Sequence, residues 1–304
     1  MAFTAKDVVA LREKTGCGMM DCKKALVECD GDMDKAVDYL REKGLASQQK
    51  KSSRIAAEGL VATYVDGKVA AMVEINAETD FVAGGDPFKE LTDKIVKIIA
   101  DTNPADVDAL LKVSVDGKTV EEMVQDLFLV VRENIQIRRF VRIEGNIVSY
   151  VHAAGRIGVL VDFDTTDAIA ANDEFVAMAK DVAMQIAAIN PSYLDKAAVP
   201  QEDFDHEKEI LIAQMKEDPK MAGKPEQVLA KIVDGKMSKF YKENCLVEQD
   251  FVKNGDITVA QYIADTAKKL GGEITLKGFT RFEKGEGIQK REDDFAAEVA
   301  SMVK

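Results

Sequence analysis

The chain has 304 residues, of which 46% are hydrophobic and 31% charged, a composition typical of soluble globular proteins with about two domains. Its net charge of −13 and isoelectric point near 4.8 argue against direct nucleic-acid binding, which usually needs a basic face, and favour protein or small-molecule partners. There is neither an apolar run of the ~20 residues that a membrane helix needs nor a signal-peptide core, so we expect a cytoplasmic protein that binds no membrane.

The first 46 residues are predicted to form three short helices. Thr4 can cap a helix over 5–14, a second helix runs over 20–29, and Asp32 can cap a third over 33–43 that Gly44 is expected to end. Their apolar positions predict a small core, marginal on its own, that consists of Val8, Leu11, Ala25, Leu26, Ala36, Val37 and Leu40.

Met19 and Met20 fall in the expected loop between the first two helices, where burial is not required. Two adjacent methionines at such a place suit an adaptable binding surface, and the alternative is that they fill the small core. The polar and basic stretch 47–58 that follows the bundle is either a linker or a solvated helix.

Four cysteines and two histidines limit the chemistry that the chain can perform. Cys17, Cys22 and Cys29 have no zinc-site spacing and no histidine beside them, so they are predicted to be free, buried thiols, and no cofactor is expected. A catalytic triad would have to use His152 or His206, and neither stands next to a nucleophile motif.

The stretch Thr79–Phe88 joins a predicted strand over 69–75 to a predicted helix. Asp86 can cap that helix and Pro87 suits its first position. Apolar residues at helical spacing predict that the helix faces a core through Phe88, Leu91, Ile95, Ile98 and Ile99. Phe81, in the connection itself, either packs under this helix or projects as a recognition residue.

From residue 59 onward the sequence repeats itself. Gly59 and Tyr64 correspond to Gly145 and Tyr150, and the segment 67–69 corresponds to 155–157. Phe175 follows Phe88 by 87 positions (175 − 88), and the Asn-Pro pairs at 103 and 190 share this offset.

A second matching block has an offset of 139 positions (258 − 119). Thr119 and Thr258 each start a predicted helix with a capping pattern, and alternating strands over 135–144 and 274–283 close the two copies. Each unit is therefore predicted as strand, strand, helix, helix, strand.

The two offsets differ by 52 (139 − 87), so the second copy contains an insertion between Asn190 and Thr258. Periodic stretches over 201–216 and 225–242 predict an antiparallel helical hairpin, which is either a contact element or a passive spacer. After a flexible break at 284–287, Phe295, Val299 and Met302 predict a short terminal helix that docks on a partner or on its own domain.

The duplication bears on Phe81. In the other copy, the segment Asp167–Ala170 is aligned with Thr79–Val82 and lacks the adjacent acid and aromatic ring. The shared scaffold therefore does not need the pair Asp80-Phe81, which favours an exposed recognition element over core packing.

The chain resembles the bacterial translation elongation factor Ts family over almost its whole length. The resemblance is carried by six stretches, namely 15–25 (TGCGMMDCKKA), 40–45 (LREKGL), 78–83 (ETDFVA), 134–139 (NIQIRR), 155–160 (GRIGVL) and 295–299 (FAAEV). Cys17 stands where the family commonly has alanine, and Gly84-Gly85 makes the loop after Phe81 more flexible than in many members.

The resemblance implies an exchange factor for the GTPase elongation factor Tu that acts by binding rather than by bond chemistry. Thr79, Asp80, Phe81 and Val82 would reach the nucleotide–magnesium site, where Phe81 wedges between helices and Asp80 disturbs the surroundings of the magnesium. Arg12, Met19 and Met20 would hold the same GTPase domain from the other side. His152 and the second subdomain would contact another domain of the partner.

The expected fold class is α+β. It comprises a three-helix, ubiquitin-associated-like domain with its linker (1–52), a first core subdomain (53–144), a second core subdomain with a hairpin at about 192–245 (145–283) and a C-terminal module (284–304). A homodimer through the core or the hairpin is a further possibility.

Three other functions are considered. An enzyme would use Glu78 and Asp80 as a carboxylate pair, although no histidine lies near them in the sequence and no cofactor fingerprint occurs. A peptide-binding or ubiquitin-like-binding module would explain only about the first fifty residues. A metal-binding protein would need ligands that the cysteines do not provide.

Overall fold

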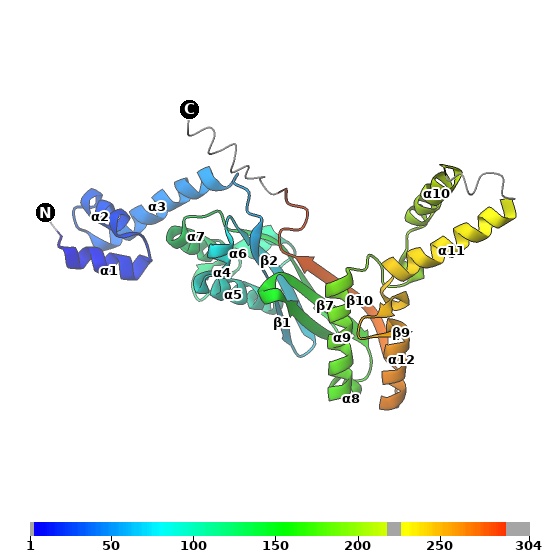
Figure 1. The fold of residues 1–304 in the computed structure, drawn as a ribbon. Helices are drawn as coiled ribbons and strands as arrows, with labels where there is room; N and C mark the ends of the chain where they lie inside the picture. Colours follow the sequence, from blue (N-terminus) through cyan, green and yellow to red (C-terminus); the bar gives the residue numbers. More distant parts are fainter. Residues whose placement is uncertain (1–2, 218–225, 290–304) are drawn as a thin grey trace. The chain divides into compact units, whose positions relative to one another are not determined.

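Figure 1 shows the fold in a computed structural model that describes residues 3–217 and 226–289. The chain divides into two compact units. Unit 1 consists of Met1–Ile143, Val151–Gly158 and Phe282–Lys304, and unit 2 of Glu144–Tyr150 and Val159–Arg281. The predicted α+β class, with N-terminal helices and several small sheets, is confirmed. The finer division into four domains stays a prediction.

Three helices form the N-terminal bundle, α1 (Ala5–Thr15), α2 (Met19–Glu28) and α3 (Met33–Lys51). The Asp7 carboxylate accepts hydrogen bonds from the Thr4 amide and hydroxyl, and the Asp32 side chain caps α3 by accepting the Lys35 N–H. The predicted core is confirmed, with Val37 only partly buried, and Cys17 and Cys22 join it as free, buried thiols. The prediction that Cys29 is buried as well is wrong, because this free thiol is only partly buried. One further buried member, Leu129, comes from outside the bundle.

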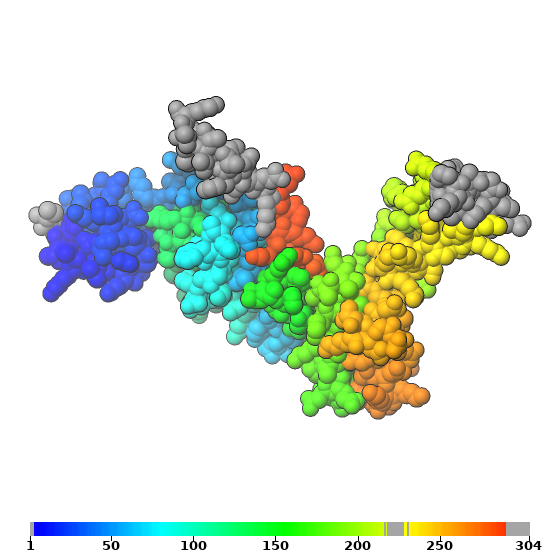
Figure 2. Space-filling model, viewed as in Figure 1, coloured from blue at the N-terminus to red at the C-terminus, as the bar shows by residue number. Residues whose placement is uncertain are grey.

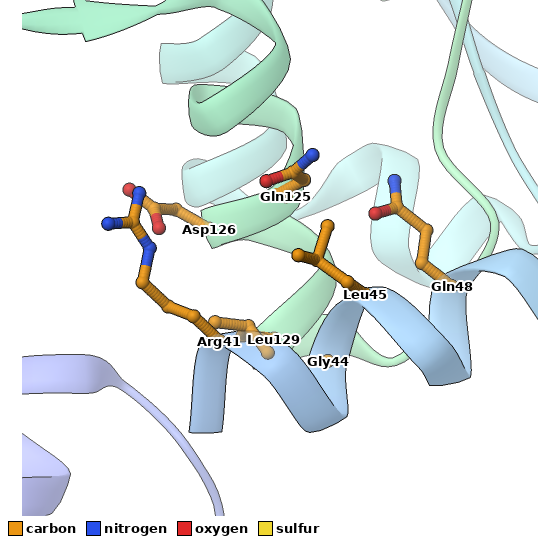
Figure 3. A pocket seen from close by; sticks show the side chains of 7 residues that line it. All are labelled: Arg41, Gly44, Leu45, Gln48, Gln125, Asp126 and Leu129. Atoms are coloured by element: carbon orange, nitrogen blue, oxygen red, sulfur yellow. The ribbon is translucent and has the colours of Figure 1, made fainter. Parts of the chain in front are cut away.

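The prediction that Gly44 ends the third helix is wrong. Helix α3 continues to Lys51, so it includes the first part of the expected linker, and Gly44 is buried inside it against α7 (Val120–Val131). A Cβ atom on Gly44 would lie 2.1 Å from Leu129 Cδ2, so any larger residue here would force the buried Leu129 side chain to move. Figure 3 shows the contact and the narrow cavity beside it, which Arg41, Leu45 and Gln125 help to line.

The remainder of unit 1 is a small sheet with helices packed on it. Strands β1 (Glu58–Asp66), β2 (Val69–Ala77) and β5 (Gln136–Glu144) are adjacent in that order, and β1 and β2 are antiparallel. The helical and short-strand elements between β2 and β5 are α4 (Asp80–Gly84), α5 (Asp86–Thr102), α6 (Val107–Lys112), β3 (Ser114–Val115), β4 (Lys118–Thr119) and α7. As predicted, α5 buries Phe88, Ile95, Ile98 and Ile99, with Leu91 partly buried.

The second repeat has a sheet in the order β10-β7-β6. Its elements are β6 (Asn146–His152), the 3-10 turn η1 (Ala153–Gly155), β7 (Ile157–Asp164), α8 (Asp167–Ala170), α9 (Asp173–Ile189), β8 (Asp250–Phe251), β9 (Asn254–Thr258), α12 (Val259–Leu270) and β10 (Thr275–Glu283). Phe163 and Phe175 pack edge to face in its core, with ring centroids 5.3 Å apart.

Local structure agrees between the two repeats. Phe88 and Phe175 are both 1% exposed. Asn103 and Asn190 both end a long helix in the left-handed conformation, with φ of 48° and 54°. Thr119 caps α7 through a complete capping box with Glu122, whereas the Thr258 side chain caps α12 by accepting the N–H three residues later. The predicted duplication therefore extends to individual turns.

The predicted insertion is a helical hairpin, α10 (Gln201–Glu217) and α11 (Glu226–Asn244), whose helices lie side by side (Figures 1 and 2). They pack through Leu211, Met215, Val233 and Met237. Short 3-10 turns, η2 (Lys196–Ala198) and η3 (Leu246–Glu248), flank the hairpin. The Tyr193 N–H donates to the Asn244 carbonyl at 3.0 Å and so joins the two ends of the insertion.

The segment 284–287 is not the flexible break that the sequence predicts. The Gly285 N–H donates to Glu74, a fully buried carboxylate in β2, at 2.7 Å, and the Lys284 N–H donates to the Arg156 carbonyl at 2.9 Å. Glu74 also pairs with Arg138 at 2.9 Å and Arg139 at 2.7 Å.

The predicted terminal helix with Phe295, Val299 and Met302 lies outside the described residues. Among the described helices, none is both long and apolar enough to cross a membrane.

The Gly44 contact can be tested with two glycine-to-alanine changes inside helices. Gly44→Ala places a methyl group against Leu129, and we expect a loss of about 1–3 kcal/mol in unfolding free energy through overpacking. Gly235→Ala in α11, where nothing lies within 4 Å, is the control and should gain about 0.5–1 kcal/mol from helix propensity. Urea unfolding measures both, and equal stabilisation of the two variants would contradict this account of the packing.

Candidate functional site

Residues 79–86 form a structured corner rather than the expected loop. Thr79 is the N-cap of the five-residue helix α4, because its side chain accepts the Val82 N–H at 3.3 Å. Helix α5 follows directly, with Gly85 as its N-cap, so Asp86 and Pro87 are its first two residues and Asp86 is not the cap that was predicted. Capping at Thr79 explains why so short a segment is helical.

Phe81 projects from this corner, and its side chain is 88% exposed. The next two residues point the other way, because Val82 is half-buried and Ala83 is buried in the unit 1 core. One helical turn therefore anchors the corner and holds the ring in water. The alternative in which Phe81 packs under its own helix is wrong.

The corresponding turn of the second repeat corrects the predicted alignment by one residue. Thr166 caps α8 by accepting the Ile169 N–H, as Thr79 caps α4, so Asp167 corresponds to Asp80 and Ala168 to Phe81. The acid is therefore present in both copies, in the first turn of a helix, where a negative charge is favourable. Only the aromatic ring is specific to the first copy.

Glu78 and Asp80 do not form a catalytic carboxylate pair. Glu78 accepts the Asn134 N–H at 2.7 Å and pairs with Arg54 at 3.1 Å, whereas Asp80 is exposed. Glu78 therefore serves the fold. In residues 3–217 and 226–289 there is also no group of three or more His, Cys, Asp or Glu side chains that could hold a metal ion.

The corner is fixed by Glu133, which follows Arg132, the C-cap of α7. Its two carboxylate oxygens accept the Thr79 N–H at 3.0 Å and the Thr79 hydroxyl at 2.8 Å. A hydroxyl that donates to a carboxylate becomes a better acceptor, which strengthens its cap on Val82. The N-terminus of α4, and with it the position of Phe81, is thus set by a residue more than fifty positions away in the sequence.

The other predicted site residues lie in two further places. Met19 and Met20 begin α2 instead of lying in a loop, and they are 39% and 72% exposed, so they do not fill the core of the bundle. Arg12 is exposed on α1. His152 is exposed at the end of β6, where Ala153 and Ala154 adopt positive φ values of 47° and 52°.

The sequence reasoning missed Arg132 and Glu133 as residues that shape the site, and it missed Leu129 as part of the bundle core. Their partners are distant in sequence, so no local pattern reveals them. One signal was present, since the family-like stretch 134–139 begins at the next residue. Burial raises the pKa of the Cys22 and Cys245 thiols, which disfavours the reactive thiolate form of both.

Comparison with known proteins agrees with the resemblance stated from the sequence. The family model described as Elongation factor TS matches residues 78–286. Elongation factor Ts of Clostridium botulinum is 48% identical, with 98% of this chain and 97% of that protein covered. The proteins of the same name from Clostridium novyi and Clostridium kluyveri are 47% and 48% identical, with 97% and 99% of this chain covered and 97% and 99% of those proteins covered.

The role of Glu133 can be tested by Glu133→Ala. The variant removes both acceptors of Thr79, so α4 should fray and the protein should lose about 1 kcal/mol of stability. Hydrogen exchange at the Val82 and Ala83 amides measures the fraying, and Glu90→Ala, an exposed change in α5, is the control. Unchanged protection of these two amides would show that the corner does not depend on Glu133.

Proposed function

Because the chain belongs to the elongation factor Ts family, we propose that the corner Thr79–Val82 is the element with which it loosens nucleotide from its partner. The protein is a guanine-nucleotide exchange factor for elongation factor Tu in translation elongation, and it has no catalytic chemistry of its own. As a member of this family of bacterial translation factors it is cytoplasmic.

The observation that carries the proposal is the exposure of Phe81 on a braced turn. A ring held in water gains free energy when another protein buries it, and full burial of a phenylalanine contributes roughly 1.5–3 kcal/mol. Each 1.4 kcal/mol corresponds to a factor of about ten in affinity, so the ring alone can supply about one to two decades. We infer that it inserts between helices of the GTPase domain near the nucleotide.

Asp80 has the supporting role in this proposal. Its carboxylate can only accept hydrogen bonds or approach cations, so it can compete for the groups that surround the magnesium ion of the bound nucleotide. An aspartate in the same helical position of the second repeat shows that the scaffold uses this acid as well. We therefore assign the larger share of the effect to Phe81.

The remaining contacts are assigned to other surfaces. The exposed side chains of Arg12, Met19 and Met20 suit a contact with the same GTPase domain, since unbranched methionines adapt to an uneven surface. His152 and the second repeat are assigned to another domain of elongation factor Tu. A homodimer through the core or the hairpin remains a separate prediction, and no direct contact with nucleic acid is proposed.

The mechanism is thermodynamic linkage. A factor that binds the nucleotide-free GTPase more tightly than the nucleotide-bound form must, by reciprocity, weaken nucleotide binding by the same factor. Phe81 contributes to exchange only if its pocket forms in the nucleotide-free state. Complex formation through the bundle and the second repeat can then proceed while nucleotide is still bound.

The first test is Phe81→Ala, with release of fluorescent GDP from elongation factor Tu followed by stopped flow. We expect stimulated release to fall about tenfold to a hundredfold, in line with the burial energy of the ring. Phe81→Leu keeps apolar bulk, so its stimulated rate of GDP release should lie between those of the wild type and the alanine variant. The affinity of Phe81→Ala for the complex of elongation factor Tu with GDP should change much less than the release rate. Wild-type stimulation by the alanine variant would refute the proposal.

A second test uses the absence of tryptophan from the chain, which makes Phe81→Trp a unique fluorophore. In the free protein the indole should emit as a solvent-exposed ring, because Phe81 is 88% exposed. On addition of nucleotide-free elongation factor Tu we expect a blue shift from burial, with the wild-type complex subtracted as the blank. An indole that stays solvent-exposed in the complex would contradict insertion of the ring.

A further inference from the structure

The bundle and the Phe81 corner are both held by three consecutive residues of unit 1, Arg132, Glu133 and Asn134. These residues connect α7 to β5 and lie in neither contact surface assigned above. Their side chains bond to three different segments of the chain, and the segments on which they act carry the methionines and Phe81.

Arg132 holds the bundle. Its guanidinium donates to Asp21 at 2.7 Å, and Asp21 directly follows Met20 in α2. Its carbonyl accepts the Lys51 ammonium at 2.6 Å, at the last residue of α3. Beside it, Val130 lies so close to the loop before α2 that a Cβ atom on Gly16 would be 2.8 Å from Val130 Cγ2.

Glu133 and Asn134 hold the corner. Glu133 accepts both hydrogen bonds from Thr79, the cap of the helix that carries Phe81. The Asn134 N–H donates to Glu78 at 2.7 Å, and its buried amide donates to the carbonyls of Ser52 at 3.2 Å and Arg54 at 2.8 Å, just after α3. The segment that leads from the end of α3 to β1 is therefore also held by these three residues.

The second repeat shows that the scaffold does not require the side chains of Arg132 and Glu133. Applying the offset of 139, Gly271 and Gly272 correspond to Arg132 and Glu133. Arg132 ends α7 with φ 60° and ψ 26°, and Gly271 ends α12 with φ 68° and ψ 29°, so the backbone turn is the same. Glycine adopts this left-handed conformation without strain and arginine does not. The first repeat thus departs from the second at Arg132 and Glu133, as it does at Phe81.

We propose that Arg132–Asn134 is a positioning brace that fixes Phe81 and the exposed Met19 and Met20 at the spacing of their two sites on elongation factor Tu. This inference rests on the proposed function of both elements. Two contacts on a rigid frame bind as one bivalent surface, so the second contact forms without a further loss of freedom. When the frame loosens, each contact remains intact but the two no longer engage together.

The test is Arg132→Gly, which installs the residue of the second repeat. The variant relieves the left-handed arginine and removes only an exposed ion pair, so its unfolding midpoint should equal or exceed that of the wild type. Its kcat/KM for nucleotide exchange should nevertheless fall about twofold to fivefold, which is the most that loss of one such ion pair can cause, because the two contacts lose their fixed spacing. A residue with a merely structural role would not separate stability from exchange in this way.

Matched variants complete the experiment. Asp21→Asn should reproduce the loss, and Asp21→Arg combined with Arg132→Asp should restore part of it. Asp34→Asn breaks an exposed pair with Lys14 inside the bundle and should leave exchange at the wild-type level. Combined with Phe81→Ala, the effect of Arg132→Gly should shrink, because no second contact is left to position.

The outcomes separate the two proposals. If Phe81→Ala slows exchange but Arg132→Gly does not, or if the effects of these two substitutions are simply additive, the brace is refuted and the proposed function stands. If Phe81→Ala exchanges nucleotide like the wild type, the proposed function fails, and the brace fails with it.

Discussion

The two hydrogen bonds that Thr79 donates to Glu133 are the constraint on which the functional geometry depends. Burial of an exposed phenylalanine within its own fold is favourable, since it removes apolar surface from water. A capped helical turn prevents this, because Val82 and Ala83 fill the inward positions and leave Phe81 the outward one. The ring stays exposed because a polar network elsewhere fixes the backbone that carries it.

The duplication separates what the fold needs from what the function adds. Where both repeats agree, as at Phe88 and Phe175, the shared residue serves the core. Where the first repeat alone has a large or charged side chain in a turn that the second builds from small residues, the scaffold gives no reason for it. Phe81, Arg132 and Glu133 all satisfy this criterion. Glu133 bonds to the cap of the helix that carries Phe81, and Arg132, the residue before it, pairs with Asp21 in the bundle.

Patterns in the sequence were sufficient for most of the fold, because its helices, strands and hairpin have clear periodicity and caps. They failed where a tertiary contact overrides a local rule. Gly44 looks like a helix stop, yet it allows α7 to approach α3. Helix α4 is too short to show periodicity, and its cap is the only local sign of it. Arg132 and Glu133 act on residues 111 and 54 positions away, a distance at which single-sequence reasoning has no signal except the comparison of the repeats.

We propose that Phe81 drives exchange, and its exposure in the free protein bears on how strongly it can do so. If the ring were buried in its own core before binding, moving it into a pocket of the partner would exchange one apolar environment for another. Its net contribution to the binding free energy would then be close to zero. A ring already in water contributes its full transfer free energy to the complex, and it does so only in the state of the GTPase that offers a pocket. Under the proposed role of Phe81, the differential affinity that linkage requires is created on the partner, and the factor holds this one side chain in solvent and keeps it in place. The proposal thus accounts for a change in the release rate of a tightly bound nucleotide without a catalytic group, through one aromatic ring and the residues that fix its position.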